Sequence, residues 1–444
     1  MTILNQTISA ESVAAMKTSA RFSEIALIIG FLTIIFSVPI TQSLSELRRG
    51  ERVQFTDVFR YGPTEGNLRQ YEKTLEDKSI FQRATRPWMQ QLEFRVLNEP
   101  GAKAIMGKPG WVFYRPDVRY LIEPDSLESG DRNSAWLPAP STNTICDSVV
   151  RAILEFRRQL AQRNIELLVV PVPGKPSMYA DKLPYVSAER SVNSPTRLLI
   201  GELQMQNIPV VDLFSLFQKL RQSQSSPLYL QTDTHWTPQG AEFAARAVAD
   251  RIRELSLPPG ASREYLTRPI KVARSGDILE MTQIPNIQSH FPAEIVECEQ
   301  VIDRKTGLLI PTAGDRPGSF RHPSQQSQIL VLGDSFCRIY QMPEPRSLGQ
   351  VLGQGPTTRP DEKTARRPLP GSAGFISHLA LQLRCPIDYI VSDGGASTDV
   401  RQKLSTNAQL LAGKKLVIWE FVERDIRLGK SGWQDIPLPA QLDN

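Results

Sequence analysis

Two short motifs in this 444-residue chain contain the residue types of a hydrolytic triad. The stretch ILVLGDSFC ends an apolar run at Gly333, Asp334 and Ser335, and QTDTHWTPQGA contains Asp233 and His235, two residues apart. A serine nucleophile needs a base to take its proton and a carboxylate to hold the imidazole in the right tautomer. Together the motifs predict a triad of Ser335, His235 and Asp233.

The element that must position Ser335 is a turn between a strand and a helix. Four apolar residues precede Gly333, and the following FCRIY resumes an apolar pattern. This layout is typical of a nucleophile on a strand-to-helix turn, where glycine allows close backbone approach and the amides after the turn can face an oxyanion. The alternative is an ordinary turn with an N-cap serine.

The element that must position Asp233 and His235 is a loop ahead of a helix. Thr237 suits an N-cap, Pro238 suits the first helical position, and residues 241–255 have helical periodicity. The alternative is a loop histidine whose ring is satisfied by backbone groups. Trp236 favours a functional loop, because an indole can exclude water or offer a stacking face to a sugar.

A parallel sheet is the scaffold that the rest of the chain predicts. An amphipathic run over residues 149–163 leads into an apolar strand, and similar strands recur with helical patterns between most of them. The strand candidates are residues 165–173, 208–213, 328–335, 387–395 and 415–421. Such unbroken apolar strands indicate an α/β fold with helices on both faces of the sheet, and its sites are expected at the carboxyl ends of the strands.

Two proline-rich stretches interrupt this pattern, and we expect them to be insertions near residues 256–326 and 341–371. The second starts a few residues after Ser335, and its prolines and glycines argue against regular structure. We expect it to form either a mobile flap beside the site or a disordered surface insertion.

Composition narrows the function classes. Apolar residues make up 40% and charged residues 22%, which is typical of a globular protein, and a net charge of +5 is too weak a bias to indicate nucleic-acid binding. Four histidines and four scattered cysteines predict no metal site and no cofactor. Cys146, Cys298, Cys337 and Cys385 are expected to be buried thiols or to form at most two disulfides, with Cys337 serving helix packing.

The N-terminal region predicts a membrane anchor over residues 25–45, after a tail over residues 1–24. Residues 25–40 are apolar, the run stays uncharged to Ser45, and Lys17 and Arg21 precede it. The alternatives are a cleaved signal peptide, with a weak cleavage site at residues 43–45, and a buried core helix. Three arginines between residues 48 and 52 follow the apolar segment, so basic residues flank it on both sides. The positive-inside rule therefore gives only a weak indication of its orientation in the membrane. We expect the bulk of the chain to lie outside the cytoplasm.

A series of motifs in fixed order gives the chain a family resemblance. They are GKPGWVFYRPDVRYL, VVPVPGKPSMY, TDTHWTPQGA, VLGDSFCRIY, AGFISHLALQL and LVIWEF, behind one apolar N-terminal segment. In this combination the chain resembles the alginate O-acetyltransferase family of the AlgJ and AlgX type, over roughly residues 101–424. The resemblance implies an SGNH-hydrolase-like fold that is circularly permuted relative to ordinary SGNH esterases. We place this domain at residues 98–430, with a linker and N-terminal extension at 46–97 and a C-terminal tail at 431–444.

The resemblance also implies roles for individual residues. Ser335 matches the nucleophile, His235 the general base and Asp233 its orienting carboxylate. A second set is expected to contact the substrate or the oxyanion: Gly333, Asp334, Trp236, Lys175, Arg338, Gly394 and Gly395. Ordinary turn chemistry is the alternative for Lys175 and the two glycines after residue 391, and a surface cation is the alternative for Arg338.

The function implied is O-acetyl transfer to hydroxyl groups of an exported polysaccharide. The implied partner is a membrane-bound O-acyltransferase that supplies acetyl groups across the bilayer, which agrees with a single-pass inner-membrane anchor and a domain facing the periplasm or the cell exterior. One alternative is a carbohydrate acetyl esterase, in which water accepts the acetyl group. The other is a non-catalytic subunit for polysaccharide assembly.

Overall fold

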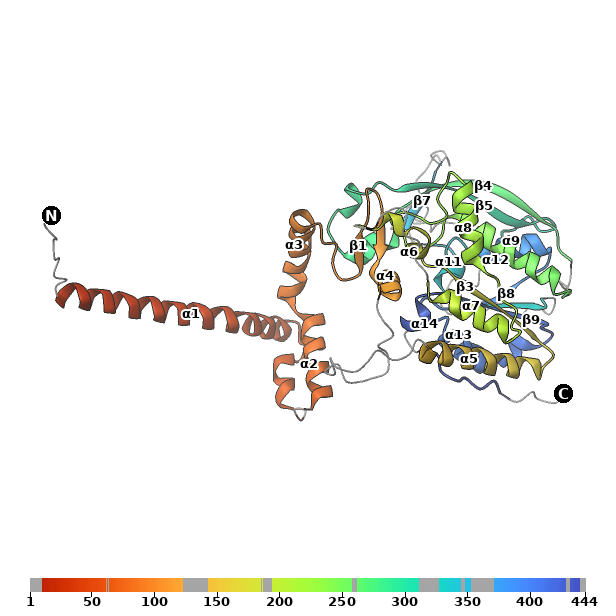
Figure 1. Ribbon diagram of the computed structural model, residues 1–444. Helices are drawn as coiled ribbons and strands as arrows, with labels where there is room; N and C mark the ends of the chain where they lie inside the picture. Colours follow the sequence, from red (N-terminus) through yellow and green to blue (C-terminus); the bar gives the residue numbers. More distant parts are fainter. Residues whose placement is uncertain are drawn as a thin grey trace, which may run out of the picture. The chain divides into compact units, whose positions relative to one another are not determined.

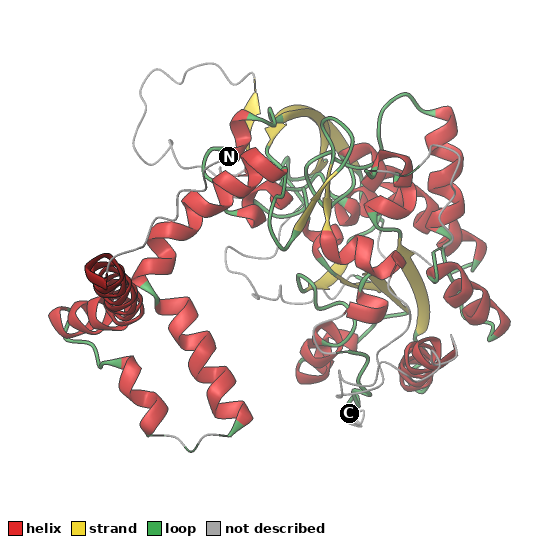
Figure 2. Ribbon diagram, turned by 60° about the vertical axis from the view of Figure 1, so that its left-hand side comes forward, coloured by secondary structure: helices red, strands yellow, loops and turns green. Residues whose placement is uncertain are grey.

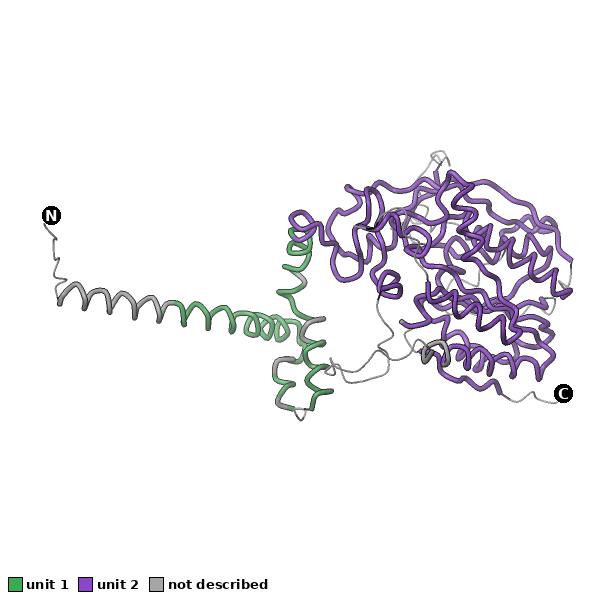
Figure 3. Tube along the Cα trace, in the orientation of Figure 1, with its two compact units in different colours: residues 1–92 green, residues 93–444 purple. Residues whose placement is uncertain are grey.

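The computed structural model describes residues 10–60, 62, 64–122, 143–184, 186, 194–257, 262–310, 327–344, 348–352, 371–428 and 432–439. The chain divides into two compact units, Met1–Leu92 and Glu93–Asn444 (Figure 3). The boundary lies a few residues before the predicted start of the α/β domain.

The first unit is helical. It contains α1 (Ala10–Arg48), the short 3₁₀ helix η1 (Gln54–Phe59), α2 (Glu65–Lys78) and most of α3 (Ile80–Leu97). The segment Leu27–Arg48 of α1 has a mean hydropathy of 2.0 and is long enough to span a bilayer, and none of its apolar window is buried. The alternative of a buried core helix is therefore wrong, whereas a membrane anchor and a signal sequence both agree with this helix.

The second unit is built on a parallel sheet, as predicted. Its strand order is β3 (Glu166–Val172), β9 (Leu416–Val422), β6 (Ile329–Gly333) and β8 (Asp388–Val391), and all three pairings are parallel. β6 and β9 are buried along their whole length, which explains their unbroken apolar sequences. The carboxyl ends of all four strands meet at one edge of the sheet. The circular permutation implied by the resemblance stays a prediction.

The strand predicted over residues 208–213 is reduced to one parallel bridge between Val210 and Val169. It stops because α8 (Leu213–Ser223) begins there, capped by the Asp212 side chain, which accepts a hydrogen bond of 3.0 Å from the Ser215 amide. Helix capping at Asp212 thus limits a sequence that is otherwise apolar enough to continue as a strand.

Helices surround the sheet (Figures 1 and 2). The longer ones are α5 (Asn143–Ala161), α7 (Thr196–Met205), α8, α9 (Pro238–Glu254), α12 (Phe375–Leu383) and α13 (Asp399–Thr406). Short helices are α4 (Arg115–Ile122), α6 (Lys175–Met178), α10 (Asp277–Thr282), α11 (Ser335–Arg338) and α14 (Asp425–Leu428). α5 and α8 contact β3, while α13 contacts β6 and β8.

A second, antiparallel sheet occupies the two stretches predicted as insertions. Its strands are β4 (Tyr265–Arg274), β5 (Glu294–Asp303) and β7 (Gly349–Leu352), in the order β5, β4, β7. The prediction that residues 341–371 lack regular structure is wrong for β7, because the edge of β4 offers hydrogen-bonding partners that local sequence preference does not reveal. Most of the expected flap, residues 353–370, lies outside the described residues.

A separate antiparallel hairpin is formed by β1 (Ala104–Met106) and β2 (Val112–Tyr114).

The described part of the predicted C-terminal tail packs onto the α/β domain. Trp433 is buried, and its ring lies 5.4 Å from that of Trp419 in β9. The Leu438 amide donates a hydrogen bond of 2.7 Å to Gln159 in α5. Residues 432–439 therefore extend the domain's core.

Candidate active site

The loop that carries Asp233 and His235 is the tip of a narrow antiparallel turn. Tyr229 bridges Trp236, and the Leu230 amide donates to the His235 carbonyl at 3.1 Å. α9 follows at Pro238, and its N-cap Thr237 accepts from the Gly240 amide at 3.2 Å. The predicted N-cap, first helical residue and helix are thus confirmed, and the loop is tied to a stable element on one side.

The carbonyl groups of this loop face a buried cation. Lys175, at the start of α6, directs its Nζ to the carbonyl oxygens of Val112 at 2.5 Å, Leu230 at 3.1 Å, Gln231 at 2.9 Å and Asp233 at 2.6 Å. Burial lowers the pKa of Lys175 to about 8, against the opposing charges of nearby carboxylates. Because its ammonium group is bonded to these carbonyls, Lys175 holds the loop in place, and its expected contact with the substrate stays a prediction.

The amide groups of the same loop face carboxylates. Glu294, at the start of β5, accepts from the amides of Gln231 at 2.9 Å and Thr232 at 3.1 Å. Asp277, at the start of α10, accepts from the Thr234 amide and hydroxyl, each at 2.7 Å. Both carboxylates come from the stretch predicted as an insertion. That stretch is therefore part of the support of the site.

Gly276 explains how α10 comes so close to the loop. A Cβ on Gly276 would lie 1.9 Å from the carbonyl oxygen of Thr232, a distance that no side chain tolerates. Glycine is required here by the approach of two backbones, and its position next to Asp277 brings that carboxylate to the loop.

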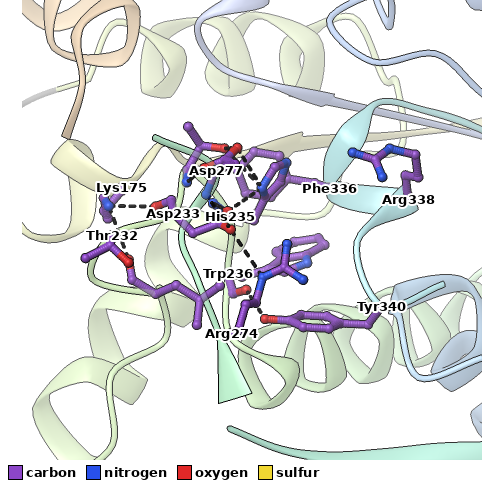
Figure 4. Close-up of polar contacts among 12 residues, drawn as sticks. Lys175, Thr232, Asp233, His235, Trp236, Arg274, Asp277, Phe336, Arg338 and Tyr340 are labelled. Carbon is purple, nitrogen blue, oxygen red and sulfur yellow. Dashed lines mark hydrogen bonds and ion pairs between the residues drawn. The ribbon is translucent and has the colours of Figure 1, made fainter. Parts of the chain in front are cut away.

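Asp233 and His235 form a buried pair at the centre of this framework (Figure 4). Asp233 Oδ1 lies 2.6 Å from His235 Nδ1, and Asp233 Oδ2 accepts from Arg274 Nε at 3.2 Å. Burial acts to raise the pKa of Asp233, but the Arg274 charge and the His235 hydrogen bond outweigh burial and hold that pKa well below its usual range. Burial acts to lower the pKa of His235, but its bond to Asp233 raises that pKa overall.

The second nitrogen of the imidazole is left without a partner. His235 Nε2 is buried and makes no hydrogen bond to any residue that the structure describes. With the Nδ1 proton donated to Asp233, Nε2 is the atom that carries the accepting lone pair. The ring is thus oriented as a general base requires.

The turn that carries Ser335 lies next to this ring. β6 ends at Gly333, and Asp334 caps α11 by accepting from the Phe336 amide at 2.8 Å. The ring centres of His235 and Phe336 are 4.8 Å apart, and Ser335 is buried with 7% of its surface exposed. The fold therefore brings together the two motifs that were singled out in the sequence.

A buried carboxyl group lies beneath the turn. Glu420 Oε2 of β9 accepts from the Asp334 amide at 2.9 Å and from Cys337 Sγ at 3.1 Å. A Cβ on Gly333 would lie 2.7 Å from the same oxygen, so glycine is required at this position. Burial and the Asp334 charge raise the pKa of Glu420 well above its usual value, and burial raises that of Asp334. Asp334 and Glu420 position the turn.

The cysteines of the described side chains agree with the expectation of buried thiols. Cys298, Cys337 and Cys385 are free and buried. Burial raises the pKa of Cys337 well above its usual value, as expected for a thiol that serves packing. The side chain of Cys146 lies outside the described set.

An ion-pair network links Asp233 to the segment after Ser335. Arg274, at the end of β4, binds Asp233 and also Glu344, with 2.5 Å between Nη1 and Oε2. Arg338 lies 3.5 Å from the same Glu344 carboxylate and forms a bond of 2.8 Å to Asp393. Arg274 and Glu344 are almost fully buried, whereas Arg338 keeps 28% of its side chain exposed. Arg338 is thus ion-paired and partly exposed, and its expected contact with the substrate stays a prediction.

Three positions from the predicted substrate set have structural partners in the described residues. Trp236 is fully buried, with its ring 5.1 Å from Phe336 and 5.9 Å from Phe375, so it packs in the core and offers no open face to a sugar. Gly394 has a φ of +62°, which favours glycine, and a Cβ on Gly395 would lie 2.7 Å from Asp399. The two glycines lie in the turn after β8, and their expected contact with the substrate stays a prediction.

Sequence reasoning missed Arg274, Asp277, Glu344 and Glu420. Glu420 offered a signal, because it is the single charged residue in the apolar strand LVIWEFV. Glu344 and Arg274 lie in stretches whose composition resembled surface loops. Only the tertiary contact shows that their charges face each other.

The metal-binding potential of the site is limited by its charges. The ligating atoms of Asp233, His235 and Asp277 lie within 4.8 Å of one another. However, the Arg274 guanidinium is bonded to Asp233, and Thr234 donates twice to Asp277. A fixed cation beside the cluster opposes a second one, so this donor set fits proton transfer better than metal coordination.

Comparison with known proteins places the chain in a family. The family model described as "SGNH hydrolase-like domain, acetyltransferase AlgX" matches residues 104–355, more than half of the chain. The probable alginate O-acetylase AlgJ of Pseudomonas putida is 21% identical over 338 residues, which cover 75% of this chain and 72% of that protein. The corresponding protein of Pseudomonas aeruginosa is 24% identical over 253 residues, which cover 55% and 58%.

Among solved structures, the O-acetyltransferase domain of Pseudomonas putida AlgJ has a TM-score of 0.48 and 19% identity, covering 73% of this chain and 92% of that one. Pseudomonas aeruginosa AlgX has a TM-score of 0.48 and 18% identity, covering 76% and 66%. The family assignment rests on the family model, and it confirms the resemblance predicted from the motifs. The chain belongs to the family of the SGNH hydrolase-like domain of the acetyltransferase AlgX.

Proposed function

We propose that the protein transfers acetyl groups to hydroxyl groups of an exported polysaccharide through an acetyl-Ser335 intermediate. The observation that carries the proposal is the buried imidazole of His235, bonded to Asp233 through Nδ1 and unpaired at Nε2, next to the turn of Ser335. The names of the AlgJ relatives support acetyl transfer and a polysaccharide acceptor.

In the first half-reaction, Ser335 Oγ attacks the carbonyl carbon of an acetyl ester while its proton moves to His235 Nε2. The donor's alcohol leaves with that proton, and an acetyl-serine ester remains. In the second half-reaction, a sugar hydroxyl gives its proton to Nε2 and its oxygen attacks the acetyl group. Ser335 leaves and regains the proton. Asp233 stays ionised and orients the ring throughout.

The test is incubation of the full chain with an acetyl-ester donor and candidate glycans, followed by mass spectrometry of both protein and sugar. An acetyl adduct on Ser335 and acetylated glycan support the proposal. Release of acetate without any acetylated sugar, across anionic and neutral glycans, identifies an esterase instead. No adduct and no turnover with an intact fold contradicts catalysis through Ser335.

The same proposal includes the anchor, the domain boundaries and the partner. α1 is proposed to hold the chain in the inner membrane with residues 98–430 on the outer side, where a membrane-bound O-acyltransferase supplies acetyl groups. If so, intact protein fractionates with membranes, and protease added after permeabilising the outer envelope digests the domain. A soluble, N-terminally shortened species shows instead that the segment is a signal peptide.

A further inference from the structure

Helix α3 exposes large apolar side chains along one face. Phe81, Trp88, Met89 and Leu92 are 60%, 74%, 52% and 55% exposed. They lie at positions i, i+7, i+8 and i+11, which share one side of an α-helix. We call these four residues the Trp88 face. Monomeric soluble proteins rarely leave such a contiguous apolar patch uncovered, so the Trp88 face indicates an interaction surface.

The opposite side of α3 is used by the chain itself. Phe94, thirteen positions after Phe81, lies across the helix from the Trp88 face and packs against a small hydrophobic cluster. Its ring contacts His290 edge-on, with 5.4 Å between ring centres. The packing of Phe94 belongs to the second unit, whereas the Trp88 face lies in the first unit and is exposed.

The position of α3 along α1 indicates the occupant. Gln42 of α1 donates to the Lys78 carbonyl at 3.2 Å and accepts from the Ile80 amide at 2.9 Å. At 1.5 Å per residue, Gln42 lies about 4.5 Å before Ser45, where the uncharged run ends. The start of α3 is therefore held near the end of the membrane-spanning segment of α1. Within the first unit, α3 runs across the direction of α1 (Figure 1).

The composition of α3 fits a lipid surface. Trp and Phe are enriched at the interface of a bilayer, and helices that lie in this plane carry basic residues beside their apolar face. Arg86 and Arg95 are exposed on either side of the Trp88 face and can reach anionic headgroups. A protein partner would explain why these residues are apolar, but it would not explain why α3 starts beside the end of the membrane-spanning segment of α1.

We propose that the Trp88 face binds the surface of the bilayer that α1 spans, with its side chains among the headgroups and upper acyl chains. The inference rests on the proposed anchor and adds a second membrane contact to it. It concerns the first unit and does not depend on the acetyl-transfer chemistry.

The experiment uses the full chain in nanodiscs of phosphatidylcholine and phosphatidylglycerol, prepared with ordinary or brominated acyl chains. Tryptophan emission is measured for the wild type and for Trp88→Phe, a mild change at an exposed position. The difference between the two gives the emission of Trp88. We expect that emission to be blue-shifted and largely lost in brominated lipid. As a control, Leu266→Trp in the Trp88→Phe background reports on an exposed apolar position of β4 and should keep its emission.

The outcomes separate this inference from the proposed anchor. Equal quenching of the wild type and Trp88→Phe, in a chain that co-elutes with the nanodiscs, overturns the lipid contact while leaving the anchor intact. Such a result points to a protein as the occupant. A chain that does not co-elute with nanodiscs overturns the anchor and the lipid contact together. Loss of Trp88 emission alone supports the inference.

Discussion

The two halves of the candidate site are held in place by different kinds of contact. Around His235, the partners are ionised: the Asp233 carboxylate with a strongly lowered pKa, the Arg274 guanidinium and the Lys175 ammonium. Around Ser335, the partners are Asp334 and Glu420, two buried acids whose pKa values are raised. His235 is held by ion pairs, and the turn of Ser335 is held by hydrogen bonds to two buried acids.

This difference follows from what each half must do. An imidazole that becomes cationic during catalysis gains from a fixed anion on Nδ1, and that anion needs a cation of its own when it is buried. A hydroxyl nucleophile gains from geometry alone, so its turn is held by a cap, a glycine and an acid on the adjacent strand. Substitutions that remove charge should therefore damage the first half far more than the second.

The largest effect is expected from the groups that react. Ser335→Ala should lower acetyl-ester turnover by about 10⁴-fold or more, and His235→Ala should cost nearly as much, because triad members act as one unit. The double variant should lose little beyond either single one. Steady-state kinetics with a small acetyl ester gives these values, with circular dichroism as the check on folding. Losses that multiply in the double variant would count against a shared catalytic unit.

The second-largest effect is expected from removing the buried charge of Arg274. Arg274→Met leaves the carboxylates of Asp233 and Glu344 buried without their partner, so we expect a loss of about 3–5 kcal/mol in the free energy of unfolding. Arg338→Met is the matched control, since Arg338 binds the same Glu344 but is partly exposed, and its expected cost is below about 1 kcal/mol. Urea unfolding measures both. Similar costs for the two variants contradict the role assigned to Arg274.

A smaller effect concerns the second carboxylate beside the imidazole. Asp277 Oδ2 lies 3.5 Å from His235 Nδ1, and its negative charge raises the pKa of that ring. In Asp277→Asn the pKa of His235 should fall, and since the neutral ring is the base, the acidic limb of the kcat/KM profile should move to lower pH by about 0.5–1 unit. A limb that stays in place or moves to higher pH contradicts this assignment.

The same residue predicts a signature in stability. Burial and the Asp233 charge raise the pKa of Asp277 from 3.8 to about 6. Between these values the native state binds more protons than the unfolded state, so the contribution of Asp277 is complete below pH 3.8 and is lost as pH rises through 6. Urea unfolding across this range should show a decline in the wild type that Asp277→Asn reduces.

The smallest effect is expected from Glu420, which lies beneath the turn of Ser335. Glu420 has a pKa raised well above its usual value, so Glu420→Gln keeps the shape and the acceptor for the Asp334 amide at a cost of about 1 kcal/mol or less. Asp233→Asn makes the same chemical change on the charged side and should lower turnover by orders of magnitude. Thermal unfolding and kinetics on the two variants compare the halves directly. Equal losses of stability and turnover in the two variants would contradict the difference between the surroundings of His235 and those of Ser335.

The sequence determined the elements that are encoded locally. The Thr237 cap, the helix after it, the strand that ends at Gly333 and the apolar α1 all follow from residue patterns within a few turns of chain. Asp233, His235 and Ser335 could be chosen because their types and motifs are distinctive. The parallel sheet could be predicted because its central strands β6 and β9 are buried on both faces and are therefore almost continuously apolar.

The tertiary structure alone decided what surrounds those residues. Arg274 and Glu344 are seventy positions apart, and nothing near either one in the sequence shows that they share a buried bond. The carbonyl partners of Lys175 lie more than fifty positions away in the chain, so the sequence around Lys175 shows none of them. β7 lies in a stretch predicted to lack regular structure, because a strand can be set by the free edge of another. Local sequence specifies caps, turns and apolar faces, whereas long-range pairing of charges and strand edges depends on which distant segments the fold brings together.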